Sequence, residues 1–413
     1  MQPRDWIPFR WPGGDSWRRV ESLAILKNSA INCLVISPAH PVADAAAQQG
    51  LVMVDPDHIP PSIRPMASAK WPRIPTSGRG RGASDAGAGP TGAPWVDSNG
   101  WLAALAHARS PESTVWLMQG PPKDAGVIRG AQYSLAIADA SAYNSRWVVS
   151  LDSALADGLA AGKTESMATW KRMDLDLRFF AAHEAWLRGE PQAVFGVLSD
   201  FAAENEYLAG EVLNLCNRRH LQYRVLDVAQ PLDLSGLKGI LVVMQTAPPA
   251  SLHEKLSAFV DSGGLLIVPA SLSRLAGGLT RTGDFENRYE YFSRGNGRLA
   301  VAQKPWADPY AVASDAHLIL SRKNDIVRLW NAGSTNAYYT RIANGDGLVQ
   351  VLNYAARAFG NPVSLWVAHS YKTARLTVLG GDKTESLTIT PRNGGSEVDL
   401  PPFDIYAAIE FGE

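Results

Sequence analysis

The first 190 residues alternate short apolar runs with longer amphipathic stretches, and this alternation predicts βαβ units around a parallel sheet. The expected strands are 6–9, 32–36, 51–54, 114–118, 134–138 and 147–151. The expected helices are 17–27, 41–49, 153–159 and 166–187. Six such units are fewer than an eight-stranded barrel of about 250 residues needs, so we expect an incomplete or degenerate (β/α) barrel over 1–190.

The apolar pattern stops between residues 60 and 94, where the chain is rich in Gly, Ala and Pro and presents no apolar face. Such a composition predicts a long surface loop. The loop follows the third expected strand, which places it at the C-terminal edge of the sheet, where ligands bind in folds of this kind. A role at a ligand site and a tolerated insertion both remain open.

Residues 191–272 again alternate strands and helices. The expected strands are 193–201, 223–227, 237–244 and 264–269, and the expected helices are 204–219 and 251–262. This order predicts a doubly wound, flavodoxin-like parallel sheet. The next segment, 273–316, is rich in Arg, Gly and aromatic residues without a clear period, and we expect a connector or an insertion there.

From residue 317 the apolar period becomes two, which is typical of half-buried strands. The expected strands are 318–320, 326–330, 337–341, 348–354, 364–368, 374–379, 386–390 and 405–411. Gly- and Asn-containing turns separate them and indicate hairpins. Residues 317–413 are therefore expected to form an antiparallel β-sandwich, and the whole chain is expected to be an α/β protein of three parts.

Composition narrows the range of functions. The 413 residues carry 39 Lys+Arg and 40 Asp+Glu, a balance that argues against nucleic-acid binding. No apolar run reaches the roughly 20 residues that span a bilayer, so no membrane association is expected. The chain as written has no signal peptide, which predicts a cytoplasmic protein unless a leader has been removed before export.

Cysteine usage and glycine motifs exclude several kinds of site. The two cysteines, Cys33 and Cys216, fall in different expected domains, so neither a disulfide nor a zinc site is expected. No Gly-rich phosphate motif follows an expected strand, which argues against a nucleotide cofactor. The sequence therefore predicts a protein without a metal or cofactor.

Two segments carry a family resemblance. Trp-Ile-Pro-Phe-Arg-Trp-Pro-Gly-Gly-Asp at 6–15, followed by a helix and by Ile-Asn-Cys-Leu-Val-Ile-Ser at 31–37, resembles the opening of the catalytic barrel in bacterial glycoside hydrolases of the β-galactosidase and β-amylase type. Residues 256–267 resemble the flavodoxin-like domain of class I glutamine amidotransferases, and within that group the trimerisation domain of bacterial β-galactosidases. This resemblance implies a carbohydrate ligand and favours a homo-oligomer.

Glycosidic cleavage commonly uses two carboxyl groups on either side of the scissile bond, one protonated and one ionised. Asp139 and Asp152 follow successive expected strands and are the candidates for acid and for base or nucleophile, with Asp55 assisting. Indole rings stack on the C–H faces of sugars. The residues expected to contact the sugar are Trp11, Trp95, Asp15 and Gln119.

The chain departs from the family at a central position. The barrel glycosidases carry an Asn-Glu pair after the fourth strand, and here Met118-Gln119-Gly120-Pro121 stands in that place. Each candidate Asp is also a common type of helix cap or turn residue. A non-catalytic carbohydrate-binding or oligomerisation scaffold is therefore the alternative to a glycoside hydrolase. An amidotransferase-like hydrolase would need Cys216 as its nucleophile, but this residue lies mid-helix on the apolar face.

Overall fold

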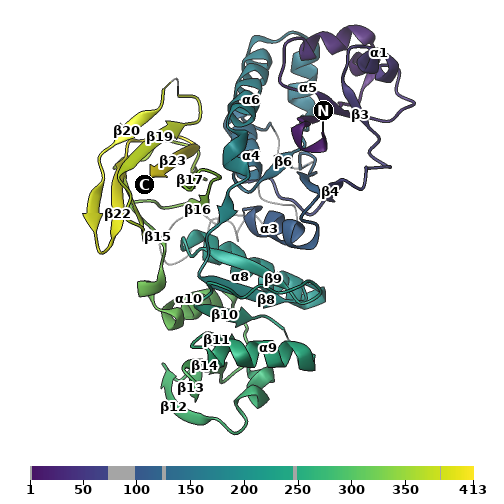
Figure 1. The fold of residues 1–413 in the computed structure, drawn as a ribbon. Helices are drawn as coiled ribbons and strands as arrows, with labels where there is room; N and C mark the ends of the chain where they lie inside the picture. Colours follow the sequence, from purple (N-terminus) through teal and green to yellow (C-terminus); the bar gives the residue numbers. More distant parts are fainter. Residues whose placement is uncertain (1, 73–97, 123–126, 245–248, 382) are drawn as a thin grey trace.

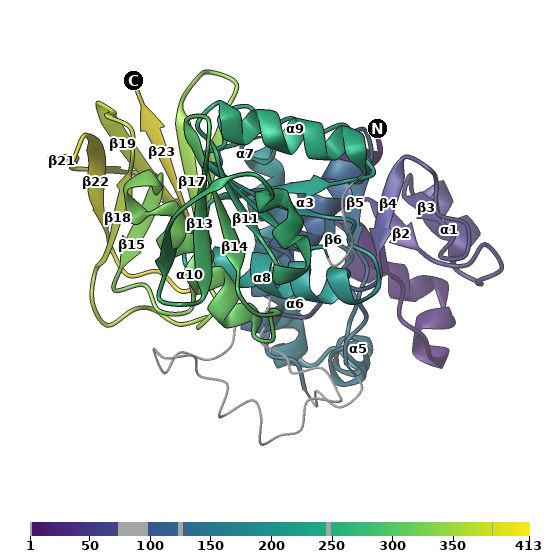
Figure 2. The ribbon, with the colours of Figure 1, turned by 90° about the horizontal axis from the view of Figure 1, so that it is seen from below.

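The computed structural model describes residues 2–72, 98–122, 127–244, 249–381 and 383–413. The protein is a mixed α/β molecule in which parallel sheets are followed along the chain by antiparallel ones. Figures 1 and 2 show the C-terminal sandwich on one side of the molecule and strand β3 on the opposite side. No helix of the described chain is long and apolar enough to cross a membrane.

Six short parallel strands form what we call the N-terminal array. They are β1 (Pro8–Arg10), β2 (Cys33–Val35), β3 (Val52–Val54), β4 (Ile63–Met66), β5 (Thr114–Leu117) and β6 (Ser145–Trp147). β1 to β3 form one sheet and β4 to β6 another. A parallel bridge between Phe9 and Val149, just after β6, joins the two sheets into the series β3-β2-β1-β6-β5-β4. All six carboxyl ends therefore lie along one edge.

Successive residues of these strands point to opposite faces, because side chains alternate along a strand. Trp116 packs with Cys33 and Val35 in an inner cluster, whereas the next residue, Leu117, packs in the outer core with Phe9. The helices that cover the outer face are α1 (Ala43–Gln48), α3 (Gly100–Arg109), α4 (Gly130–Ala142), α5 (Ser153–Ala160), α6 (Thr164–Ala182) and α7 (Glu184–Leu187).

Three expectations for this region are wrong. Residues 134–138 belong to helix α4 rather than to a strand, because the segment is buried on all sides and no polar face marks its helical period. The stretch 17–27 forms 3-10 turns, η2 (Asp15–Arg18) and η3 (Val20–Leu26), instead of an α-helix. Strand β4 lies inside the interval expected to be a loop, and residues 73–97 of that interval are outside the described chain.

The next sheet along the chain has seven strands. Its parallel strands are β8 (Phe195–Ser199), β9 (Tyr223–Asp227), β10 (Gly239–Val242), β11 (Leu265–Val268) and β14 (Gly297–Ala302), in the order β9-β8-β10-β11-β14. This is the 2-1-3-4-5 order of one group of doubly wound sheets. Helices α8 (Ala203–Arg218) and α10 (Pro309–Leu320) cover one face, and α9 (Ala250–Asp261) covers the other.

The segment expected as a connector is part of this sheet. β12 (Thr280–Phe285) and β13 (Tyr289–Arg294) form an antiparallel hairpin that extends the sheet beyond β14. β12 is largely exposed and β13 is mostly half-buried, and the apolar alternation that would have identified them is therefore weak. Residues 318–320, expected as a strand, lie in the last turn of α10.

The C-terminal strands form two facing antiparallel sheets. The smaller sheet comprises β15 (Val327–Trp330), β18 (Val363–Val367), β21 (Thr390–Arg392) and β22 (Gly395–Leu400). The larger sheet comprises β16 (Thr335–Arg341), β17 (Gly347–Asn353), β19 (Thr373–Val378), β20 (Glu385–Leu387), β23 (Tyr406–Gly412) and β7 (Glu190–Pro191). Leu365 of one sheet and Val349 and Ile409 of the other share one apolar core. The predicted strand and turn pattern of this region is thus largely observed.

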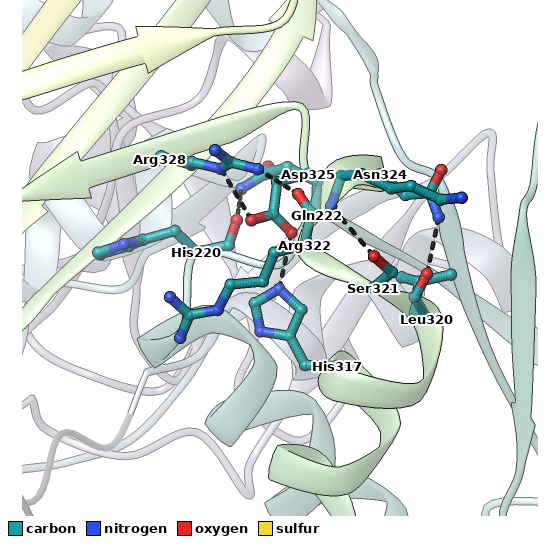
Figure 3. A network of polar contacts seen from close by, with 10 residues as sticks. His220, Gln222, His317, Leu320, Ser321, Arg322, Asn324, Asp325 and Arg328 are labelled. Atoms are coloured by element: carbon teal, nitrogen blue, oxygen red, sulfur yellow. Dashed lines mark hydrogen bonds and ion pairs between the residues drawn. The ribbon is translucent and has the colours of Figure 1, made fainter.

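A buried polar network holds the sandwich to the seven-stranded sheet (Figure 3). The Nε2 atom of His317, on α10, lies 2.7 Å from Oδ1 of Asp325, and Nε of Arg328 donates to the other carboxylate oxygen at 3.0 Å. His220, just after α8, hydrogen-bonds to Thr335 at the start of β16. These contacts fix the positions of the two parts relative to each other.

Candidate functional site

The carboxyl edge of the N-terminal array is the first place to seek a ligand site, because ligands bind at this edge in parallel α/β folds. Trp11 follows β1, Asp55 follows β3, Gln119 follows β5 and Asp152 follows β6. Trp11 and Asp55 come directly after their strands, Gln119 is the second residue after β5, and Asp152 is the fifth residue after β6. Their side chains have different environments.

Arg10, the last residue of β1, is a site residue that the sequence analysis missed. Phe9 packs in the outer core, so the side chain of Arg10 points to the inner face. A Cβ atom added at Gly120 would lie 3.7 Å from Nη1 of Arg10, which places the guanidinium beside the segment after β5. The backbone N–H of Arg10 is already bound to the carbonyl of Val149.

The guanidinium of Arg10 has unused hydrogen-bonding capacity. Its Nε atom is buried and has no hydrogen-bond partner, and no carboxylate of the described chain lies within ion-pair distance. Burial lowers the pKa of Arg10 from its usual value, because the charged form loses hydration. A half-buried cation of this kind is suited to a ligand that brings hydroxyl or anionic oxygens.

Asp55 forms a small polar pair after β3. Its Oδ2 atom lies 2.8 Å from Nδ1 of His58, and its Oδ1 atom accepts a hydrogen bond from the backbone of Asp57 at 3.1 Å. The His58 hydrogen bond, followed by the Asp57 one, lowers the pKa of Asp55. The same contact raises the pKa of His58. Asp55 is consequently an ionised carboxylate, suited to accepting a proton or a hydroxyl group rather than donating a proton.

Asp152 lies after β6 and is a helix cap. Its Oδ1 atom accepts from the N–H of Leu155 at 3.0 Å, at the start of α5. Its Oδ2 atom accepts from the hydroxyl of Tyr133 at 2.9 Å, and the hydroxyl oxygen accepts from the backbone N–H of Asp152. The carboxylate is buried, and both of its oxygens already accept hydrogen bonds from the protein.

Asp139 does not follow a strand, and that expectation is wrong. It lies on α4 and is fully buried. The carboxylate accepts hydrogen bonds from Asn99 (backbone 3.1 Å, Nδ2 2.7 Å), Ser98 and the Tyr354 hydroxyl. Burial raises the pKa of Asp139, and the hydrogen bonds from Tyr354, Asn99 and Ser98 oppose that rise. Since Tyr354 follows strand β17, Asp139 binds the N-terminal array to the sandwich.

Trp11 is a packing residue. It is buried, and its Nε1 atom donates to the backbone carbonyl of Trp17 at 2.8 Å. Its ring meets the rings of Phe9 and Trp17 edge-on, at centroid distances of 6.0 and 5.2 Å. A ring held in this way has little free face for stacking on a sugar.

The other three residues predicted to contact a sugar are Asp15, Gln119 and Trp95. Asp15 is exposed at the start of η2. Gln119 is half-buried at the carboxyl edge, and its backbone carbonyl accepts from Nε1 of Trp71 at 3.1 Å. Trp95 lies outside the described residues. Of the two described residues, Gln119 lies at the carboxyl edge and Asp15 does not.

The described chain contains no cluster of three or more His, Cys, Asp or Glu side chains that could hold a metal ion. Cys33 and Cys216 are free and buried, and burial raises the pKa of each thiol to about 12. A thiol in that state is a poor nucleophile, because the thiolate is the reactive form. Cys216 lies on α8 as expected, and its environment does not support an amidotransferase reaction.

Comparisons with known proteins identify the fold. No family model and no curated protein sequence matches the chain. A β-galactosidase from Bacillus circulans sp. alkalophilus superposes with a TM-score of 0.54 at 12% identity, over 76% of this chain and 58% of that structure. A catalytic mutant of a GH42 β-galactosidase from G. stearothermophilus superposes with a TM-score of 0.51 at 11% identity, over 76% and 56%.

The chain therefore has a β-galactosidase-like glycoside hydrolase fold, as its sequence resemblance predicted. It spans less than two thirds of the length of those two structures. At this level of identity the likeness concerns the fold alone.

Proposed function

We propose that the protein binds carbohydrate at the carboxyl edge of its N-terminal array, which we interpret as a degenerate (β/α) barrel. The series β3-β2-β1-β6-β5-β4 brings the first strand against the last, as in a closed barrel, and leaves β3 and β4 unpaired with each other. The seven-stranded sheet and the sandwich then correspond to the flavodoxin-like and C-terminal parts of a β-galactosidase-like chain. Under this interpretation the ligand edge is the one that carries Arg10.

Arg10 is the observation on which the proposal rests. A guanidinium at the inner carboxyl edge, with a buried Nε that has no partner, can donate to sugar hydroxyl oxygens. Gln119 and the ionised Asp55 lie on the same edge and add an amide and a carboxylate for further hydroxyl groups. This combination of donors and acceptors suits a neutral polyhydroxylated ligand.

The described carboxylates support binding better than hydrolysis. A glycosidase needs one carboxyl group that stays protonated beside one that is ionised. Asp139 has the raised pKa, but it is enclosed on α4 by three hydrogen-bonding residues. Asp152 is engaged as a cap, and Asp55 has a lowered pKa. We therefore expect no hydrolysis by an Asp139 and Asp152 pair.

A screen of the purified protein against aryl-glycosides and oligosaccharides tests this function. We expect an oligosaccharide to raise the thermal unfolding midpoint while no aryl-glycoside is hydrolysed above the buffer rate. Hydrolysis that disappears in Asp139→Asn or Asp152→Asn would instead establish a glycosidase with those carboxylates. No response to any sugar would refute carbohydrate binding and favour the oligomerisation scaffold.

A further inference from the structure

A cavity of about 450 Å³ opens where the N-terminal array, the seven-stranded sheet and the sandwich meet. Helix α3 lies between the array and β9 (Figure 1), and its residues Ala104 and Ala108 are part of the cavity lining. Three aromatic side chains from distant segments line the cavity: Tyr143 after α4, Tyr223 on β9 and Tyr338 on β16. The rings of Tyr143 and Tyr338 are 4.8 Å apart between centroids. The volume and the aromatic walls are typical of a site for a small molecule with a ring.

A second cavity, of about 250 Å³, adjoins the first. His107, Pro111, Asn144 and Leu187 line both cavities, so the two share a wall. The second cavity lies at the amino ends of β5 and β6, where Thr114 and Ser145 begin those strands. This face of the array is opposite to the edge that carries Arg10, and the two cavities are therefore independent of the carbohydrate site proposed above.

The charged side chains that line the second cavity include one more base than acid. Arg4, Arg146 and Arg188 line it, against Glu112 and Glu184. Glu184 is paired with Arg188 four residues further along the chain, so its charge is already balanced. The side chain of Arg4 is largely exposed, and its Nε atom lies 3.9 Å from Oδ1 of Asp5, a long ion pair. The lining has a net positive charge.

Of the three arginines that line this cavity, Arg146 has no ion pair within the described chain. It is half-buried, and its Nη2 atom donates to the backbone carbonyl of Arg4 at 2.9 Å. No carboxylate of the described chain lies within ion-pair distance of it, and burial lowers its pKa more than Glu184 and Asp5 raise it. An arginine in this position gains most from a bidentate oxyanion, which would replace the water it has lost.

His107, which lines both cavities, is neutral. Burial lowers the pKa of His107, and its Nε2 atom lies 3.0 Å from the carbonyl oxygen of Asn144. We propose that the two cavities form one binding site for a small ring-bearing anion, whose ring lies among Tyr143, Tyr223 and Tyr338 and whose phosphate or carboxylate binds Arg146.

Isothermal titration calorimetry of the full chain with four probes tests this site: phenyl phosphate, glucose 6-phosphate, glucuronate and inorganic phosphate. We expect at least one ring-bearing anion to bind at least tenfold more tightly than inorganic phosphate. Comparison of glucose 6-phosphate with glucuronate separates phosphate from carboxylate recognition, and phenyl phosphate shows whether an aromatic ring is preferred to a sugar ring. Equal binding of all four, or no binding of any, would overturn the proposal.

Two variants and one control locate the binding. Arg146→Gln removes the anion contact and should weaken the preferred probe at least tenfold. Ala108→Phe fills the aromatic cavity from α3 without changing a charge, and should weaken that probe while leaving inorganic phosphate unaffected. The control Arg64→Gln removes an exposed arginine on β4 outside both cavities and should change nothing. Full binding in Arg146→Gln, or an equal loss in Arg64→Gln, would contradict the assignment.

Discussion

The carboxylate of Asp139 is expected to stabilise the junction between the N-terminal array and the sandwich. Replacing Asp139 with Ala removes the acceptor of two buried donors, the backbone N–H of Asn99 and the hydroxyl of Tyr354. Of the other two donors, Nδ2 of Asn99 also donates to the carbonyl of Lys70, and Oγ of Ser98 donates to Asp139 across 3.4 Å, a weak contact whose loss adds little.

The magnitude follows from these two orphaned groups. A buried donor left without an acceptor costs roughly 1–3 kcal/mol, so two of them cost about 4 kcal/mol. Burial of the carboxylate is itself unfavourable, as its raised pKa indicates. Removing it therefore offsets part of that cost. We expect Asp139→Ala to lower the free energy of unfolding by about 3 kcal/mol. Asp139→Asn keeps the volume and one acceptor, and we expect it to cost about 1 kcal/mol.

Urea unfolding followed by tryptophan fluorescence measures this effect in the N-terminal part, where 10 of the 13 tryptophans lie. A double-mutant cycle with Tyr354→Phe should show a coupling of about 1–2 kcal/mol, because the two side chains share a hydrogen bond. Full additivity, or a loss below about 1 kcal/mol in Asp139→Ala, would refute this structural role.

Two further predictions concern packing and pH. Gly100→Ala should cost about 1–3 kcal/mol of unfolding free energy, because the added Cβ would lie 2.5 Å from the buried ring of Tyr143. Gly130 is the control, because it also stands at the first position of a helix and a Cβ there would lie 3.6 Å from Thr169. Gly130→Ala should cost little in the same urea assay. Burial lowers the pKa of His220 from 6.5 to about 4, so the folded state favours neutral His220, and its contribution to stability is full above pH 6.5 and is lost as the pH falls towards 4. The free energy of unfolding should therefore change less between pH 7 and 4.5 in His220→Asn than in the unmodified protein. Asn tolerates the φ of +57° at this position. An equal change in both proteins would contradict the role given to His220.

The sequence predicted most of the strands that appear as short apolar runs between polar turns. Strands β8 to β11 and the strands around Leu365 and Val349 were expected within a few residues of their observed positions. Helix α4 was not, because its residues from Tyr133 to Ala142 are all buried and show neither a two-residue nor a helical period. Hairpin β12–β13 was missed for another reason, since β12 is largely exposed, β13 is mostly half-buried, and neither shows a clear apolar alternation.

The candidate site was harder to predict than the fold, because the contacts that decide what each side chain can do come from residues far apart in the chain. Asp152 was correctly placed after a strand, but the hydrogen bonds to Leu155 and Tyr133 that occupy it are visible only in the structure. Arg10 stands at the end of an apolar strand and looks like a surface residue in the sequence. The packing of Phe9 in the outer core and the approach of Gly120 show that it faces the inner edge. The cavity beside Arg146 likewise combines segments far apart in the chain.

Calorimetric titration of the preferred oligosaccharide into the protein and into Arg10→Gln tests the proposed carbohydrate site most directly. The Arg64→Gln variant, an exposed arginine away from the carboxyl edge, is the matched control. We predict at least a tenfold weaker affinity in Arg10→Gln and an unchanged affinity in Arg64→Gln, which would place the sugar at the carboxyl edge. Unchanged sugar binding in Arg10→Gln would contradict the proposed site.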